Sequence, residues 1–278
     1  MSNQLLALYG LKHNPFSISV PVETLWKPPS VERFFHRVDV VVREGGFILI
    51  SGENGLGKSK ILQSLSRHLG HRSSDVLVGV IERPQNNISD LYRELGELFG
   101  VTLVHNNRYR GFKELRKRWQ AHIAAARFKP ILLIDEAQEM SSLCLNELRL
   151  LTSENFDSDC ILSVVLCGDT RLLDRLSLPE LVPLGSRIRA RHKLEALDKE
   201  GLLGFMNHQL EEAGAPQLMT LELKNTLAEH SGGNLRILCT IGSEMLSLAA
   251  EQGLKQLDDK LYLETYSLSA IKKSRQNK

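Results

Sequence analysis

A glycine-rich run that ends in lysine and serine is the part of the sequence with the clearest chemical meaning. Residues 52–59 read Gly-Glu-Asn-Gly-Leu-Gly-Lys-Ser and match the phosphate-loop pattern G-x-x-x-x-G-K-[ST]. In such a loop main-chain N–H groups approach phosphates, Lys58 reaches the β- and γ-phosphates, and the Ser59 hydroxyl ligates Mg²⁺. The alternative is an ordinary glycine-rich turn before a helix. The residues that we expect to contact the nucleotide here are Asn54, Gly55, Leu56, Gly57, Lys58, Ser59 and Lys60.

Two carboxylates follow a second apolar run. Residues 131–134 are all aliphatic, which is typical of a buried parallel strand, and Asp135 and Glu136 come directly after it. Ligands bind at the carboxyl edge of such sheets. We therefore expect Asp135 to hold Mg²⁺ through water beside Ser59, and Glu136 to orient and deprotonate the attacking water. The two motifs together predict hydrolysis of ATP or GTP.

Further polar residues at three places could sense or stabilise the γ-phosphate. A third apolar run, residues 161–167, ends just before Asp169 and Thr170, either of which could be a sensor, although a helix cap is an equal alternative. A strand-like segment that ends at Leu194 contains Arg187, Arg189 and Arg191, and in a ring or filament an arginine there can reach a neighbour's γ-phosphate. Arg236 follows a Gly-Gly-Asn turn and could couple the nucleotide to the angle of a second domain.

A basic stretch offers a candidate nucleic-acid surface. Residues 101–129 contain eight lysines or arginines against one acid, with Tyr109 and Trp119 among them. Such a surface could neutralise phosphates of DNA, whereas the alternative is a solvated helix face with Trp119 in the core. The candidate DNA contacts are Arg108, Arg110, Lys113, Arg116, Lys117 and Arg118.

The order of patterns predicts an α/β fold. Apolar runs alternate with helical patterns up to residue 197, and only helical patterns follow. We expect an arm packed on the core (1–35), a nucleotide-binding core with a parallel sheet between helices (36–197), and a smaller all-helical lid (198–278). Pro15 and Phe16 in the arm could line an adenine slot, and plain packing is equally compatible with these residue types.

The composition of the chain limits the classes of protein to which it can belong. Apolar residues make up 42% and charged residues 24%, the net charge is only +2, and the four cysteines form no C-x-x-C pair. No apolar run is long enough for a membrane span, and the first residues lack the features of a signal peptide. These observations favour a cytoplasmic protein with free thiols and without a membrane partner.

Taken together, these motifs resemble those of AAA+ ATPases, and more narrowly those of the ExeA-like group, which includes the transposition regulators TniB, TnsC, MuB and IstB. The similarity extends over almost the whole chain. It is carried by Tyr9-Gly10-Leu11, Asn14-Pro15-Phe16, Gly52 to Ser59, Asp135-Glu136-Ala137-Gln138, Val165 to Asp169, Ser186-Arg187-Ile188 and Gly232 to Arg236.

The resemblance implies an ATP- and Mg²⁺-dependent protein that assembles as a ring or helical filament on double-stranded DNA and recruits a transposase. It implies Arg187 as a trans arginine finger, Arg236 as the lid sensor and Asp169 at the first-sensor position. Asp169 departs from the usual Gln, Thr or Asn, so Thr170 could take that role. The alternative function is a secretion-type or signalling ATPase that acts on proteins without DNA. The membrane segment and peptidoglycan-binding region of ExeA secretion proteins do not occur in this sequence, which counts against a secretion role.

Overall fold

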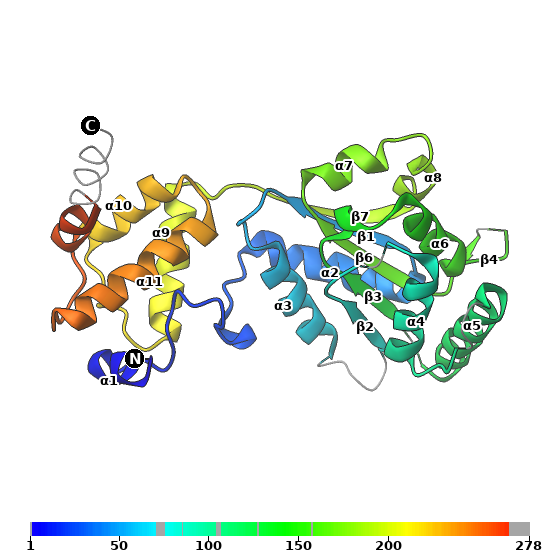
Figure 1. Ribbon diagram of the computed structural model, residues 1–278, viewed down its shortest axis with the longest axis horizontal. Helices are drawn as coiled ribbons and strands as arrows, with labels where there is room; N and C mark the ends of the chain where they lie inside the picture. Colours follow the sequence, from blue (N-terminus) through cyan, green and yellow to red (C-terminus); the bar gives the residue numbers. More distant parts are fainter. Residues whose placement is uncertain are drawn as a thin grey trace. The chain divides into compact units, whose positions relative to one another are not determined.

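The computed structural model describes residues 2–70, 76–84, 86–103, 107–126, 128–156 and 158–266. The chain divides into two compact units (Figure 1). Residues 27–54 and 58–194 form what we call the sheet unit. Residues up to 26, residues 55–57 and residues from 195 onward form what we call the helical unit. Each unit is described by itself.

The centre of the sheet unit is a five-stranded parallel sheet. Its strands run in the order β2 (Val78–Ile81), β3 (Ile131–Ile134), β6 (Ser163–Gly168), β1 (Phe47–Gly52) and β7 (Ile188–Leu194). Every residue of β1, β3 and β6 is buried, because helices cover both faces of a parallel sheet. The edge strand β7 instead alternates between buried and accessible positions.

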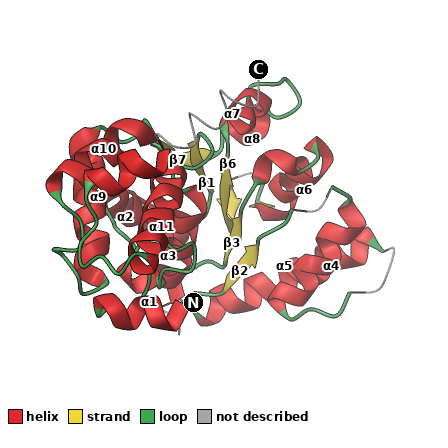
Figure 2. Cartoon of the chain, turned by 60° about the vertical axis from the view of Figure 1, so that its left-hand side comes forward, coloured by secondary structure: helices red, strands yellow, loops and turns green. Residues whose placement is uncertain are grey.

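Two groups of helices cover the two faces of this sheet. Figure 2 shows α2 (Pro29–Glu44) and α3 (Lys58–Gly70) on one side, and α4 (Ile88–Phe99), α5 (Arg108–Ala125) and α6 (Ser142–Thr152) on the other. On the second side Trp119 of α5 is fully buried and meets Phe99 of α4 edge to face, with ring centroids 5.3 Å apart. Trp119 therefore belongs to the core and does not face solvent beside the basic residues.

Short elements complete the sheet unit. The helical turn η2 (Ala137–Glu139) follows β3, and α7 (Thr170–Leu176) and α8 (Val182–Gly185) connect β6 to β7. Strands β4 (Ser153–Glu154) and β5 (Asp159–Cys160) pair as a small antiparallel hairpin before β6. The side chains of Asn87, Asn107, Ser141 and Asp169 cap α4, α5, α6 and α7.

The C-terminal part of the chain is helical, as the sequence predicted. Its main helices are α9 (Lys199–Glu212), α10 (Leu221–Ser231) and α11 (Leu235–Glu251). Residues 259–266 are also helical. The basic tail after residue 266 lies outside the described residues. Within the described residues, the structure contains no helix with the length and apolar character needed to span a bilayer.

The N-terminal arm differs from its prediction. It begins with a helix, α1 (Ser2–Tyr9), continues through the turn η1 (Val22–Thr24), and up to residue 26 packs in the helical unit instead of on the nucleotide-binding core. Tyr9 Oη donates to the carbonyl of Leu254 at 2.9 Å, and the ring of Phe16 lies where a side chain at Gly242 would have to be. Apolar burial explains the difference, because Leu11 and Phe16 complete this unit's core.

Candidate nucleotide-binding site

The sheet brings the predicted motifs to one edge. All five strands are parallel, so the loop after β1, Asp135 after β3 and Asp169 after β6 lie at their carboxyl ends. Strand β6 lies between β1 and β3 and pairs with both. Asp169 therefore follows the strand that lies between the strand before the phosphate loop and the strand before the two carboxylates.

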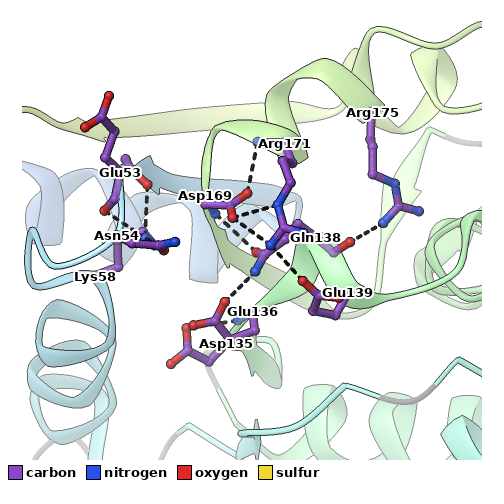
Figure 3. A network of polar contacts seen from close by, with 11 residues as sticks. Glu53, Asn54, Lys58, Asp135, Glu136, Gln138, Glu139, Asp169, Arg171 and Arg175 are labelled. Carbon is purple, nitrogen blue, oxygen red and sulfur yellow. Dashed lines mark hydrogen bonds and ion pairs between the residues drawn. The ribbon is translucent and has the colours of Figure 1, made fainter.

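The phosphate loop has the backbone that its glycines allow. Gly55 and Gly57 have φ angles of 89° and 93°, which glycine tolerates far better than other residues. Lys58 begins α3 and is only 6% exposed. Its ammonium donates to the carbonyls of Gly52 and Glu53 at 3.0 Å and to Asn54 Oδ1 at 3.4 Å (Figure 3). The cation is thus held at the loop itself, where phosphate oxygens would be stronger acceptors than these carbonyls.

Two oxygen donors fit a magnesium ion. The Ser59 hydroxyl has no hydrogen-bond partner among the described residues, and the Asp135 carboxylate accepts the main-chain N–H of Glu136 at 3.0 Å and interacts with the Cys167 thiol. Hydroxyl and carboxylate oxygens are the ligands that Mg²⁺ prefers. Burial first, and then the charge and hydrogen bond of Asp135, raise the pKa of the neighbouring Cys167 thiol, so it stays protonated and offers no thiolate.

Glu136 stands in a fixed backbone conformation. Its φ angle of 49° lies in the left-handed region, which is unusual for a residue other than glycine. Its carboxylate accepts a hydrogen bond from the Gln138 amide through Oε2, and the Gln138 amide oxygen accepts the N–H of Asp169 at 3.1 Å (Figure 3). Gln138 thereby joins the residue expected to activate water to the end of β6.

Asp169 is both a helix cap and an ion-pair partner. Its carboxylate accepts the main-chain N–H of Arg171 at 2.9 Å and Arg171 Nε at 2.8 Å. Burial of the carboxyl acts to raise its pKa, but the hydrogen bonds and charge of Arg171 outweigh it, so the pKa of Asp169 is lowered. The cap that the sequence left open is therefore present, and Arg171 compensates a negative charge that would otherwise be unfavourable near a γ-phosphate.

Sequence reasoning missed Arg171 as part of this site. Its guanidinium also pairs with Glu139 at 2.8 Å, so it spans the end of β6 and the turn after β3. An arginine two residues after the sensor position, in the first turn of α7, was the only sequence signal. Thr170, the alternative sensor, is exposed at the start of the same helix.

The two predicted arginines differ in their contacts, and the main-chain N–H of Arg236 donates to the carbonyl of Gly55 in the phosphate loop at 3.0 Å. Arg187 precedes β7 and donates to the carbonyl of Arg149 at 3.2 Å and to the Ser153 hydroxyl, so its guanidinium is held inside the sheet unit. Arg236 is exposed in the first turn of α11, in the helical unit. Pro15 and Phe16 are buried in the helical unit, which is the packing role that the sequence left open beside an adenine slot. The roles of these residues toward nucleotide remain predictions.

The six basic candidates on α5 separate into two sets. Arg108, Arg116 and Arg118 bond inside the sheet unit: Arg108 to the buried Glu147, Arg116 to the carbonyls of Leu151 and Ser153, and Arg118 to the carbonyl of Phe99. The other set is exposed and forms no ion pair with any described residue. It consists of Arg110, Lys113 and Lys117.

Comparison with known proteins agrees with this geometry. Residues 42–176 match a family model described as an AAA domain, a range that includes the phosphate loop, Asp135, Glu136 and Asp169. General secretion pathway protein A of Aeromonas hydrophila is 29% identical over 275 residues, which is 95% of this chain and 48% of that protein. The chain thus spans about half the length of this relative.

Solved structures share the fold at low sequence identity. The Aeropyrum pernix ORC1 protein in complex with DNA is 16% identical with a TM-score of 0.68, covering 93% of this chain and 70% of that chain. Domain III of the Thermotoga maritima replication initiation protein DnaA is 22% identical with a TM-score of 0.58, covering 89% and 95%. The AAA domain match covers residues 42–176, and the order of the parallel strands and the phosphate loop show the P-loop NTPase fold that AAA+ proteins share.

Proposed function

We propose that this chain hydrolyses ATP with Mg²⁺ at the carboxyl edge of its sheet. The observation that supports this most directly is the arrangement of Lys58, Asp135 and Glu136 at the ends of two strands, with β6 between them. Lys58 and the loop amides bind the phosphates, and Ser59 and Asp135 hold Mg²⁺. When bound, Mg²⁺ neutralises charge on the β- and γ-phosphate oxygens.

Glu136 is the general base in this proposal. It takes a proton from a water molecule whose oxygen attacks the γ-phosphorus, the bond from that phosphorus to the bridging oxygen of ADP breaks, and ADP and phosphate are released. The test is phosphate release by the purified full chain with Mg²⁺-ATP. Glu136→Gln should bind Mg²⁺-ATP normally but hydrolyse it about 100-fold or more slowly. Equal rates for this variant and the wild type would contradict the assignment.

The second part of the proposal is that α5 binds duplex DNA. Arg110, Lys113 and Lys117 follow one another at spacings of three and four residues, which places them on one face of the helix. Tyr109, which is 68% exposed, lies under the Lys113 ammonium at 4.4 Å from its ring centroid. Glu114 is the one acid on this helix, and the three cations form no ion pair with any described residue. Such an exposed cationic row suits a phosphate backbone and carries no sequence specificity.

This surface favours a nucleotide-dependent assembly on DNA. We propose homo-oligomers, as rings or filaments, that bind double-stranded DNA in the ATP state and present it to a transposase. Structures of DNA-bound relatives of this fold support the DNA part, and the resemblance to transposition regulators motivates the partner. Co-sedimentation with duplex DNA in ATP, in ADP and without nucleotide tests it. Pelleting only with ATP is expected, and the absence of DNA binding in every state would overturn it.

A specific observation favours a second function. The similarity to general secretion pathway protein A covers almost the whole chain, so the same ATPase core could act on a protein partner in secretion. Charge reversal at Arg110, Lys113 and Lys117 separates the two functions. Under the DNA proposal these changes weaken duplex binding and lower its salt dependence, whereas under the secretion alternative DNA plays no part in the activity and ATP turnover stays the same with and without DNA.

A further inference from the structure

Gln138 occupies a position that neither phosphate binding nor metal binding explains. It lies in the turn η2, two residues after Glu136, and it is only 6% exposed. Its main-chain carbonyl accepts a hydrogen bond from Arg175 at 2.5 Å, which fixes the turn from the side of α7. Its side chain lies between Glu136 and the end of β6 (Figure 3).

The orientation of its amide follows from its partners. The main-chain N–H of Asp169 can only donate, so the group that faces it at 3.1 Å must be the amide oxygen. The NH₂ group then faces the opposite way, toward Glu136 Oε2, to which it donates. A carboxylate accepts such a bond in its ionised form, which is the form that a general base requires.

The absence of a side chain at Gly168 leaves room for the Gln138 amide. A Cβ atom at residue 168 would lie 2.6 Å from Gln138 Oε1, closer than any real contact of that kind. Gly168 is not among the glycines with positive φ, so another residue could adopt its backbone. A methyl carbon of Leu172 would also lie 2.8 Å from that Cβ, so room for both Gln138 and Leu172 accounts for glycine at the end of β6 better than conformation does.

The neighbouring cation is not free to orient Glu136 instead. Arg171 is engaged by Asp169 and by Glu139, both at 2.8 Å. Among the described residues, Oε2 of the half-buried Glu136 accepts the bond from Gln138 and Oε1 has no hydrogen-bond partner, so one carboxylate oxygen is held by the protein and the other is not. Two independent restraints thus act on Glu136, one on its backbone and one on its carboxylate.

We propose that Gln138 is a positioning residue that holds the Glu136 carboxylate ready for proton transfer and ties it to the main chain of Asp169. This rests on the proposed hydrolysis of ATP at the same site. The end of β6 then influences the general base through a main-chain N–H, while the Asp169 carboxylate stays engaged with Arg171. A misplaced base of this kind lowers the rate of the chemical step and leaves nucleotide affinity unchanged.

The test compares two substitutions in the full chain. Gln138→Glu keeps the shape and the acceptor for Asp169 but offers a second carboxylate where Glu136 needs a donor, and Gln138→Ala removes both bonds. For each, kcat should fall about 10-fold to 100-fold while the Kd for Mg²⁺-ADP stays within about twofold of the wild-type value. Gln256→Ala, which removes a glutamine amide that donates to the carbonyl of Gln217 in the helical unit, is the control and should change neither quantity.

A double-substitution cycle distinguishes positioning from general loss of structure. If Gln138 acts through Glu136, adding Gln138→Ala to Glu136→Gln should slow single-turnover hydrolysis by less than about twofold. Losses that multiply, or a Gln138 variant that hydrolyses ATP as fast as or faster than wild type, would overturn the inference. A wild-type protein that binds Mg²⁺-ATP without hydrolysing it would instead overturn the proposed function, and the inference with it.

Discussion

The edge of the sheet and the helix α5 both gather charged residues, but they hold them in different ways. At the sheet edge, Lys58, Glu136 and Asp169 are each bound to a neighbour, and Lys58 and Asp169 are almost fully buried. On α5, half of the basic candidates bond to the rest of the sheet unit and half stand in solvent. The charged residues of the sheet edge therefore form an array held by hydrogen bonds. On α5 we call the three bonded cations the structural set and the three cations without an ion pair the free set; these are Arg108, Arg116 and Arg118, and Arg110, Lys113 and Lys117, respectively.

The difference between the two regions indicates which charged side chains a ligand can contact. A bonded and buried charge at the sheet edge is oriented in advance, so binding a nucleotide there requires little reorganisation. On α5, Arg108, Arg116 and Arg118 already have partners within the protein, although Arg108 and Arg118 are exposed, whereas Arg110, Lys113 and Lys117 form no ion pair with any described residue and can release counterions from DNA without breaking one. Burial therefore favours function at the first region, whereas exposure favours it at the second.

The largest expected effect comes from the sheet edge. Lys58→Ala removes a cation that three loop acceptors hold in place, and the proposed site then lacks its contact with the β- and γ-phosphates. We expect ATP hydrolysis to fall about 100-fold or more and nucleotide affinity to fall with it. Phosphate release and titration with a fluorescent nucleotide measure both. Lys60→Ala, two residues along the same helix and bonded to exposed Gln63, serves as a charge-matched comparison with a smaller effect.

The next effect tests the free set on α5. Replacing Arg110, Lys113 and Lys117 together by alanine should weaken duplex binding about 10-fold to 1,000-fold at moderate salt, because each side chain neutralises up to one phosphate. The slope of log K against log salt should become shallower by about one for each phosphate that is no longer neutralised. Fluorescence anisotropy with a labelled duplex at several salt concentrations gives both values. An unchanged slope would show that this face does not meet the phosphates.

The third effect tests the structural set on the same helix. Arg108 pairs with Glu147, whose side chain is 2% exposed and which also accepts a bond from Tyr92 at 2.6 Å. Arg108→Ala would leave this buried carboxylate without its cation and should lower the free energy of unfolding by about 1–3 kcal/mol. Urea unfolding measures the change. Arg110→Ala, two residues away and exposed, should change stability by less than about 0.5 kcal/mol, and equal losses would remove the distinction between the two sets.

Much of the sheet edge could be predicted from sequence because strand ends fix it. Once β1, β3 and β6 are parallel neighbours, the residues that follow each must meet, and Lys58, Asp135 and Asp169 do so. What the sequence could not provide was which side chains bind one another across that edge. Gln138 and Arg171 emerge only when the turn after β3 and the first turn of α7 are placed together.

The basic helix and the arm were harder to predict, for physical reasons. A count of charges does not tell which cations turn toward carbonyls and carboxylates of neighbouring helices, as Arg116 does toward Leu151. The arm was expected to pack on the nucleotide-binding core, but apolar burial of Phe16 in the helical unit decides where it packs. In both cases long-range contacts outweigh the local pattern.

The smallest expected effect concerns the contribution of Asp169, at the sheet edge, to the stability of the fold. Arg171 lowers the pKa of Asp169, so the ionised carboxylate contributes stability that is present above the unfolded value of about 3.9 and is lost as pH falls through the lower folded value. Asp169→Asn keeps a good helix cap but has no charge. Its Tm should lie about 2 °C or less below that of wild type at pH 7, and the two should converge as pH falls below 4. Thermal unfolding across this range measures the difference, and a gap that stays constant down to pH 3 would mean that packing, and not the ion pair with Arg171, sets the effect of this residue.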